Sequence, residues 1–254
     1  MNPRTCSRAA DERPSGPSRA VFLLLVFLSS CAVATPDPIR GEDHSVFAAR
    51  LRASLPLGEV SDDGSDTLEI ELTRDEGDFT QTLEGIDFIR LDDVRIDAPA
   101  EVEAEFELTT ASVMFYRHID SDSRLSGGWA AGFGVARLDL AVSAGVLAES
   151  DARTALGPVM AGELVFEISQ DLEAFTRLTL TAGFPSTYLN RLDAGAQWRP
   201  LSHLGVIAGW HFGYFELTEE SDTRSDIEIR SRGPFVTLAF VLPRKQSARA
   251  GQAP

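Results

Sequence analysis

The feature that most constrains this chain is an alternation of apolar and polar residues with a period of two, repeated in segments of about ten residues. Clusters of Gly, Pro, Asp and Ser separate these segments. Successive side chains of a β-strand point to opposite faces, so the period predicts strands with one apolar and one polar face. Downstream of residue 40 there is no run of about 18 consecutive apolar residues, so no membrane-spanning helix is predicted.

The segment 188–199 shows the pattern most clearly. Tyr188 and Trp198 bound its apolar face, and the opposite face carries Arg191, Asp193 and Arg199. Ten residues at a rise of about 3.3 Å and a tilt of about 45° cover roughly 23 Å, close to the ~25 Å apolar band of membrane β-barrels. The segment is therefore predicted to span a membrane, with its charged face lining the barrel interior.

The pattern predicts an all-β protein, an antiparallel up-and-down transmembrane β-barrel of eight strands. The strands are expected at 46–55, 102–117, 128–145, 157–169, 171–183, 188–199, 203–217 and 226–242. Ten strands is the alternative, because 67–72 and 86–91 form either an external flap or two further strands. Long and short connections alternate largely as such barrels require, which places both termini in the periplasm.

Two of these segments change phase. In 128–145 the apolar set moves from Trp129 and Phe133 to Leu138 and Leu140, and in 226–242 it moves across Gly233-Pro234. A β-bulge shifts the phase of a strand and accommodates a proline, so we expect a bulge in the second segment. In the first segment a bulge and a break into two strands are equally consistent with the pattern.

The alternation assigns side chains to the two faces of the barrel. The aromatic residues expected at the membrane interfaces are Tyr116, Trp129, Tyr188, Trp198, Trp210 and Tyr214. The charges expected in the interior are Glu163, Glu167, Glu173, Arg177, Arg191, Asp193, Arg199 and His211. Glu103, Glu105 and Glu107 are expected on the external end of one inner face, where they either attract cations or extend into solvent.

The N-terminus has the features of an export signal. A short apolar run, AVFLLLVFL, follows a leader that contains arginines, and small residues come after it. The prediction is a signal peptide over 1–34, or over 1–30 if Cys31 ends a lipobox and is lipidated. A periplasmic linker at 35–44, the barrel at 45–242 and a basic tail at 243–254 complete the expected organisation.

Composition excludes several classes of function. The formal charge of -16 disfavours nucleic-acid binding, because phosphate backbones repel an acidic surface. Both cysteines lie in the N-terminal stretch and the four histidines are scattered, so neither a disulfide nor a metal site is predicted for the body. No GxSxG, P-loop or dinucleotide motif occurs, and no cofactor is expected.

The last predicted strand contains SRGPFVTL, with Gly233, Val236, Leu238 and Phe240 at the positions of a C-terminal assembly signal. With its recurring strands, the chain resembles the small proteobacterial outer-membrane barrels of the OmpA/OmpW/opacity-like type. The resemblance implies a Gram-negative outer-membrane location, lipid as the surroundings and the barrel-assembly machinery as a partner during biogenesis. Members usually end on an aromatic residue, whereas here PRKQSARAGQAP follows.

The function expected from this resemblance is a non-enzymatic structural, envelope or surface-contact role. A narrow pore or small-ligand conduit is the first alternative. A lipid-modifying or proteolytic enzyme is the second, in which His211 and one of Glu163, Glu167 and Glu173 would form a hydrogen-bonded pair that acts as general base. A soluble lipocalin-like barrel, with an apolar interior and a polar exterior, is the competing architecture.

Overall fold

A computed structural model describes residues 36–57, 65–91, 94–119, 124–184, 186–218 and 224–242. The predicted signal peptide, the lipidation candidate Cys31 and the basic tail lie outside these residues. All regular elements of the described part are β-strands, which confirms the all-β prediction. Among the described residues, no helix is long and apolar enough to cross a membrane.

Twelve strands are present in the described residues. They are β1 (Ile39–Ser45), β2 (Phe47–Pro56), β3 (Ser65–Leu83), β4 (Phe88–Leu91), β5 (Val94–Asp97), β6 (Ala100–Ile119), β7 (Leu125–Ala144), β8 (Leu147–Ser169), β9 (Leu172–Gly183), β10 (Thr187–Leu201), β11 (Leu204–Leu217) and β12 (Ile227–Val241).

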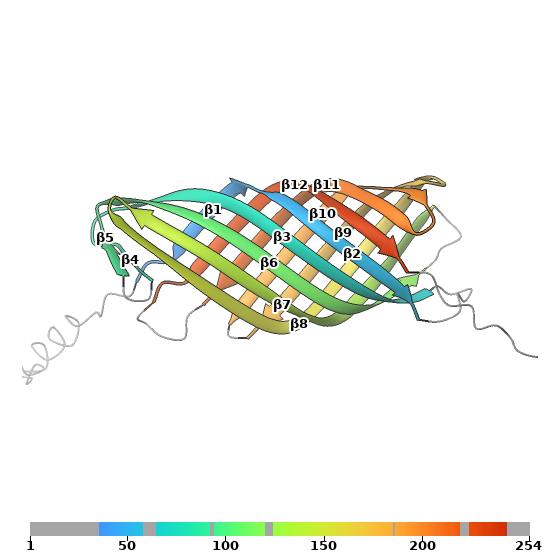
Figure 1. Ribbon diagram of the computed structural model, residues 1–254, viewed down its shortest axis with the longest axis horizontal. Coiled ribbons are helices and arrows are strands. Elements are labelled where there is room, and N and C mark those ends of the chain that lie inside the picture. The colour runs from blue at the N-terminus through green and yellow to red at the C-terminus, as the bar shows by residue number, and fades with distance from the viewer. Residues whose placement is uncertain are drawn as a thin grey trace, which may run out of the picture. The chain divides into compact units, whose positions relative to one another are not determined.

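Ten of these strands form one sheet that closes into a ring (Figure 1). From β2 round to β12, neighbours in the sheet pair in antiparallel fashion. The ring closes where β12 pairs in parallel with β2, from Phe235 opposite Ala48 to Val241 opposite Ser54. Within the described residues the closed circuit contains nine strands, because β1 continues the line of β2 and pairs only with β12. The sheet thus has ten strands, as the alternative count had it, but not from both of the expected segments: 67–72 belongs to the long strand β3, whereas 86–91 contributes β4 to a separate hairpin.

An odd number of strands places the two ends of the described chain at opposite ends of the ring. The Ile39 amide donates a hydrogen bond to the Asp226 carbonyl at one end, and the Leu242 amide donates to the Ser54 carbonyl at the other. The first described strand thus begins and the last described strand ends on opposite sides of the ring, unlike the arrangement expected from an even number of strands, and the termini themselves lie outside the described residues. The expected linker at 35–44 is also partly structured, because β1 begins at Ile39.

Along most of its length the ring has exposed apolar side chains outside and charged side chains inside. The outward residues come from every strand of the circuit and include Leu51, Ile70, Val113, Phe133, Met160, Leu178, Leu192, Trp210 and Leu238. Glu71, Arg177, Arg191 and Asp193 are among the buried inward residues. We call this part the charge-filled section.

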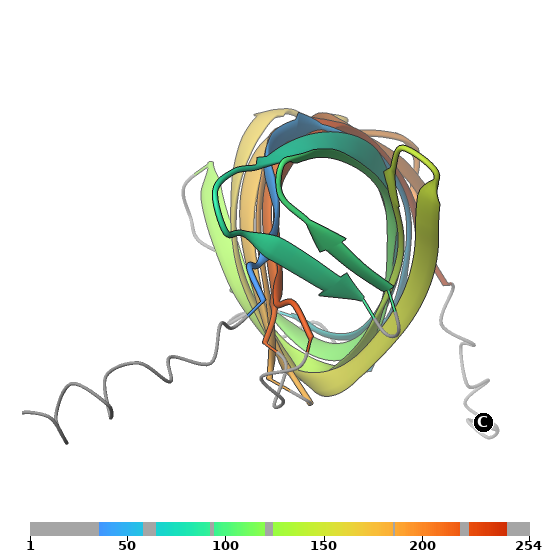
Figure 2. The same cartoon turned by 90° about the vertical axis from the view of Figure 1, so that its left-hand side faces the viewer.

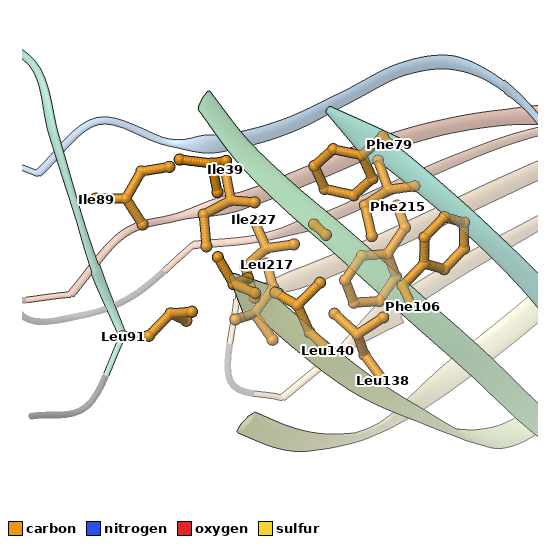
Figure 3. Packing of buried hydrophobic residues seen from close by; sticks show 14 of the residues in the cluster. Ile39, Phe79, Ile89, Leu91, Phe106, Leu138, Leu140, Phe215, Leu217 and Ile227 are labelled. Carbon is orange, nitrogen blue, oxygen red and sulfur yellow. The ribbon is translucent and has the colours of Figure 1, made fainter. Parts of the chain in front are cut away.

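The polarity is reversed at one end of the ring. Here the inward side chains are apolar and pack together, among them Phe79, Phe106, Leu138, Leu140, Phe215, Leu217 and Ile227 (Figure 3). The outward side chains of the same strands are polar or charged and include Glu103, Glu105 and Asp139. We call this part the apolar-filled end.

The reversal is abrupt and follows the strand register. One outward row across β3, β6, β7 and β8 consists of Leu72, Ala111, Val135 and Leu156, and the next outward row consists of Arg74, Thr109, Arg137 and Thr154. No residue is inserted between these rows. The backbone therefore keeps its period of two while the apolar face moves from the outside of the ring to the inside.

This reversal explains both predicted phase changes. The ladders of β7 with β6 and with β8 run without a register shift, and so does the ladder of β11 with β12. The predicted bulge in 226–242 and the predicted bulge or break in 128–145 are therefore wrong. Phe133 and Leu138 lie on opposite faces of one regular strand: Phe133 is exposed on the outside and Leu138 is buried on the inside.

The same effect corrects the assignment of β6. Glu103, Glu105 and Glu107 point outward, and the alternate residues Val102 and Phe106 fill the interior. The three glutamates are thus on the outer face of the apolar-filled end. They do not line the inside of the ring.

A two-stranded hairpin, β4–β5, lies across this end of the ring (Figure 2). Ile89, Leu91 and Ile96 join the interior cluster. The Arg90 amide donates a hydrogen bond to the Ser225 hydroxyl, and the Ser225 amide donates to the Arg90 carbonyl, which ties the hairpin to the β11–β12 connection. The hairpin and the apolar cluster together close this end.

Candidate functional site

Eight charged side chains from five strands occupy the middle of the ring. The guanidinium groups belong to Arg50 and Arg52 of β2, Arg177 of β9 and Arg191 of β10, and the carboxylates to Glu69 and Glu71 of β3, Glu163 of β8 and Asp193 of β10. Because side chains alternate along each strand, all eight point to the enclosed face. Within these eight the four positive and four negative charges balance, and one further buried carboxylate, Asp75 of β3, points to the same interior.

The first half of this network connects β2, β10 and β3. Arg50 Nη1 lies 2.8 Å from Asp193 Oδ2, and Arg191 Nε donates to the same oxygen at 3.1 Å. Arg191 Nη1 donates to Thr73 Oγ1 at 3.1 Å, and Nη2 of the same guanidinium bonds Glu71. One arginine therefore links residues of two strands that are far apart in the sequence.

The second half connects β2, β3, β8 and β9. Arg52 Nη2 donates to Glu71 Oε2 at 3.1 Å. Arg177 bonds both Glu69 oxygens and donates from Nη1 to Glu163 Oε2 at 3.0 Å. Its side chain is fully buried, so the two carboxylates are compensated by a charge that water does not reach.

Burial of charge is tolerated only when each group is paired and hydrogen-bonded. Each of the eight groups has an ion-pair partner, although Arg50 Nε and Nη2, Arg177 Nε and Asp193 Oδ1 are buried without a hydrogen bond. Phe235 lies beneath Arg50 with 4.1 Å between the ring centroid and Cζ. The middle of the ring is consequently filled with paired side chains. The apolar cluster closes the interior a second time, nearer to the hairpin.

On the other side of the network is a cavity of about 490 Å³, which we call the vestibule. It lies at the end of the ring formed by the β8–β9 and β10–β11 turns and by the last residues of β12. Arg52, Glu69 and Glu163 form its floor. Its size falls in the range of small-molecule sites in proteins, about 300–1,000 Å³.

The vestibule wall combines aromatic, apolar and polar groups. Tyr116 and His118 stack with their ring centroids 6.3 Å apart and an interplanar angle of 24°. Val165, Ile207 and Ala239 provide an apolar strip. Other lining residues are Gln197, Arg124, Glu167, Glu173 and Arg199, and Arg199 Nη2 donates to Glu173 Oε2 at 2.7 Å.

The structure separates the predicted interior charges into two groups. Arg177, Arg191, Asp193 and His211 are buried, and Glu163 joins them from the vestibule floor. Glu167, Glu173 and Arg199 line the vestibule, and the Arg199 side chain is 51% exposed. The last three are thus accessible to solvent and lie outside the buried network.

The predicted interface aromatics divide differently. Trp129, Tyr188, Trp198 and Trp210 are exposed on the outer face. Tyr214 is half-buried on that face, and its hydroxyl donates to Glu216 Oε2 at 2.8 Å. Tyr116 corrects the prediction: it points inward and is buried, because β6 presents its even positions to the interior along its whole length.

The residues of the predicted assembly signal lie on β12. Val236 and Leu238 are exposed on the outer face with Phe240, and Gly233 is inward. A side chain at Gly233 would meet the backbone of Val46, with an added Cβ only 1.8 Å from its carbonyl oxygen. The glycine therefore permits the close approach of the first and last strands where β1 gives way to β2.

Sequence reasoning missed half of the network. Arg50, Arg52, Glu69 and Glu71 come from two segments for which no interior charge was predicted, RLR in β2 and LEIEL in β3. Both segments alternate charged and apolar residues, and their charges have opposite signs. That signal was present, but only the ring closure brings these segments beside β9 and β10.

His211 does not pair with any of the glutamates that the enzyme alternative would require. It is fully buried, and its register partners are Asp193 and Gly233. The vestibule is lined by Glu163, Glu167 and Glu173 but not by His211. This histidine is thus separated from the cavity in which a substrate could meet those carboxylates.

Two further observations concern alternatives to the vestibule as the candidate site. A larger concavity, about 910 Å³, lies on the apolar-filled end and is lined by Arg74, Glu103, Asp139 and neighbouring residues, and it is wide open to solvent. Among the described residues, no group of three or more His, Cys, Asp and Glu side chains could hold a metal ion. The vestibule is therefore the more enclosed of the two large concavities.

No protein-family model, curated protein or solved structure matches this chain.

Proposed function

We propose that this chain is a non-enzymatic β-barrel of the bacterial outer membrane whose interior is sealed against the passage of solutes. The observation that carries the proposal is the charge-filled section: exposed apolar side chains cover its outside, while ion pairs fill its inside. In water this arrangement would expose apolar surface on every strand of the closed circuit. In a bilayer, lipid solvates that surface and the closed sheet satisfies the backbone.

The aromatic residues support the same setting. Tyr188 and Trp198 are exposed near opposite ends of the outward face of β10. Tyrosine and tryptophan are enriched at both boundaries of a membrane, where an apolar ring and a polar group are solvated by different layers. The polar outer rows beyond Leu72 and Val135 then mark where the ring leaves the hydrocarbon.

The apolar-filled end suits an aqueous surrounding on the outer side of the membrane. It has the polarity of a water-soluble barrel, and it carries the hairpin and the long 218–226 connection. At the vestibule end, the β8–β9 and β10–β11 turns contain two residues each, and the β6–β7 and β2–β3 connections contain five and eight. At the apolar-filled end, the β7–β8 and β9–β10 turns contain two and three residues, but the two longest connections, 84–99 and 218–226, also belong to this end. Because outer-membrane barrels have their longer loops outside, we use these two connections to place the vestibule toward the periplasm.

A sealed interior distinguishes this proposal from a narrow pore. A solute would have to displace the paired Arg177, Glu69 and Glu163 and then the apolar cluster beyond them. Separating a buried ion pair costs several kcal/mol, so an open path is not expected at equilibrium. The roles that remain are a structural one and the binding of a ligand in the vestibule, which is the accessible concavity.

Fractionation, gel mobility and conductance test the proposal together. We expect the mature protein in the detergent-extractable outer-membrane fraction, with a mobility shift on boiling that reports the loss of the closed sheet. Reconstituted in planar bilayers, it should give no discrete conductance steps. A freely water-soluble protein would refute the membrane proposal, and stable conductance steps would refute the sealed interior.

A further inference from the structure

We infer that the vestibule binds a small zwitterion, a ligand that carries an ammonium and a carboxylate or phosphate close together, with an apolar group attached. The inference deepens the proposed function by giving the periplasm-facing concavity a ligand class. It depends on the arrangement of charges at the vestibule floor.

Two opposite charges lie side by side on that floor. Arg52 Nη1 and Glu163 Oε2 are 3.8 Å apart, beyond hydrogen-bond distance, although each side chain bonds another partner at 3.0–3.1 Å. Their side chains are 11% and 12% exposed, whereas Arg177 behind them is fully buried. They are thus the accessible groups of a network that is otherwise enclosed.

The neighbouring partners hold these two groups in place. Arg52 is bonded to Glu71, and Glu163 is bonded to Arg177. A ligand ammonium could bond the free lone pairs of Glu163 while its carboxylate meets the remaining guanidinium hydrogens of Arg52. Hydrogen bonds between charged partners are about twice as strong as neutral ones, and preorganised partners lose little entropy on binding.

The other charged side chains of the vestibule also carry both signs. Arg199 is paired with Glu173 near the mouth, and Arg124 and Glu167 line the cavity. A zwitterion can use both signs at once, whereas an ion of one sign would meet only one of the two floor groups. The strip of Val165, Ile207 and Ala239 offers burial for an apolar group on the same ligand.

Free amino acids and zwitterionic lipid headgroups share this chemistry. Four probes test the two points separately. L-leucine, 3-methylbutylamine (the same skeleton without the carboxylate) and 4-methylpentanoate (without the ammonium) show whether both charges are needed. Glycerophosphoethanolamine shows whether the ligand is a lipid headgroup. Binding is measured by titration calorimetry on the full mature protein in detergent. The loss of one charge-assisted contact predicts binding of the amine and the acid roughly 10- to 100-fold weaker than that of leucine.

The outcomes are distinguishable. Leucine binding with this margin supports a free amino acid or short peptide, and binding of glycerophosphoethanolamine alone supports a lipid headgroup source. Equal affinity for leucine and for either singly charged analogue overturns the inference, and so does no binding by any probe. Because these tests use the folded wild-type protein, their failure leaves the membrane location and the sealed interior untouched.

A substitution adds a test of the residue assignment. Glu163→Gln keeps a hydrogen-bond acceptor for Arg177 and should weaken leucine binding about tenfold, with little effect on 4-methylpentanoate. Glu103→Gln, on the outer face of the apolar-filled end, is the matched control and should change neither affinity. An unchanged leucine affinity in a Glu163→Gln protein that retains its boiling shift would overturn the assignment.

Discussion

Removing Arg177 should destabilise the ring more than removing any exposed arginine. The guanidinium is fully buried and bonds Glu69 and Glu163, whose side chains are 5% and 12% exposed. An Arg177→Met substitution preserves much of the volume but leaves two carboxylates in a site with little water. Breaking a buried pair by deleting one partner costs about 3–5 kcal/mol.

Arg52 limits this loss without preventing it. It is 3.8 Å from the nearest oxygen of each carboxylate, too far for a hydrogen bond. We therefore expect Arg177→Met to lower the free energy of unfolding by about 3–5 kcal/mol. The measurement is urea unfolding in detergent or vesicles, followed by tryptophan emission and by the loss of the boiling shift.

Arg199→Met is the control. Arg199 also belongs to the inward set of its strand, but its side chain is 51% exposed and is paired with Glu173. Exposed ion pairs contribute about 0–1 kcal/mol, so this variant should unfold close to the wild type. If the two substitutions had equal effects, or if Arg177→Met cost less than about 1 kcal/mol, then water would be solvating the network and the argument for a sealed interior would be wrong.

Three further substitutions test other parts of the structure. Ala194→Arg places a cation on the outward face of β10 and should cost about 2–4 kcal/mol of stability in vesicles. Glu103→Arg should cost little because that position faces water. Equal costs would contradict the proposed boundary between the lipid-facing and water-facing parts of the ring. Leu140→Ala removes a buried side chain of the apolar-filled end, with an expected loss of about 2–5 kcal/mol, and should speed tryptic cleavage at Arg95 in the hairpin; unchanged cleavage would show that the hairpin does not depend on this cluster. Burial raises the pKa of Asp226, so the folded state disfavours the charged carboxylate. The resulting destabilisation is absent at a pH below the pKa of Asp226 in the unfolded chain and complete at a pH above its pKa in the folded protein. Asp226→Asn should therefore raise the melting temperature at neutral pH but not in strong acid, and a gain that persists in acid would exclude this cause.

The alternation of residues by itself determined that this chain is all-β and which residues share a face of each strand. Both inferences need only the period of two, because the pleat sends successive side chains to opposite sides. On β10 this reasoning put Arg191 and Asp193 together on one face, opposite Leu192, and the structure has them so. It also identified Tyr188 and Trp198 as outward residues.

What the alternation could not determine was which face is inside, since that depends on what surrounds the sheet. On β6 the apolar residues Val102 and Phe106 point inward, and on β10 Leu192 points outward, although both strands have the same pattern. Ring closure likewise decided that Glu71 of β3 meets Arg177 and Arg191, and that Arg50 of β2 meets Asp193, residues more than 100 positions away. Only the tertiary structure decides such contacts, because local patterns give each strand two faces but do not say which side of the closed sheet encounters lipid, water or charge.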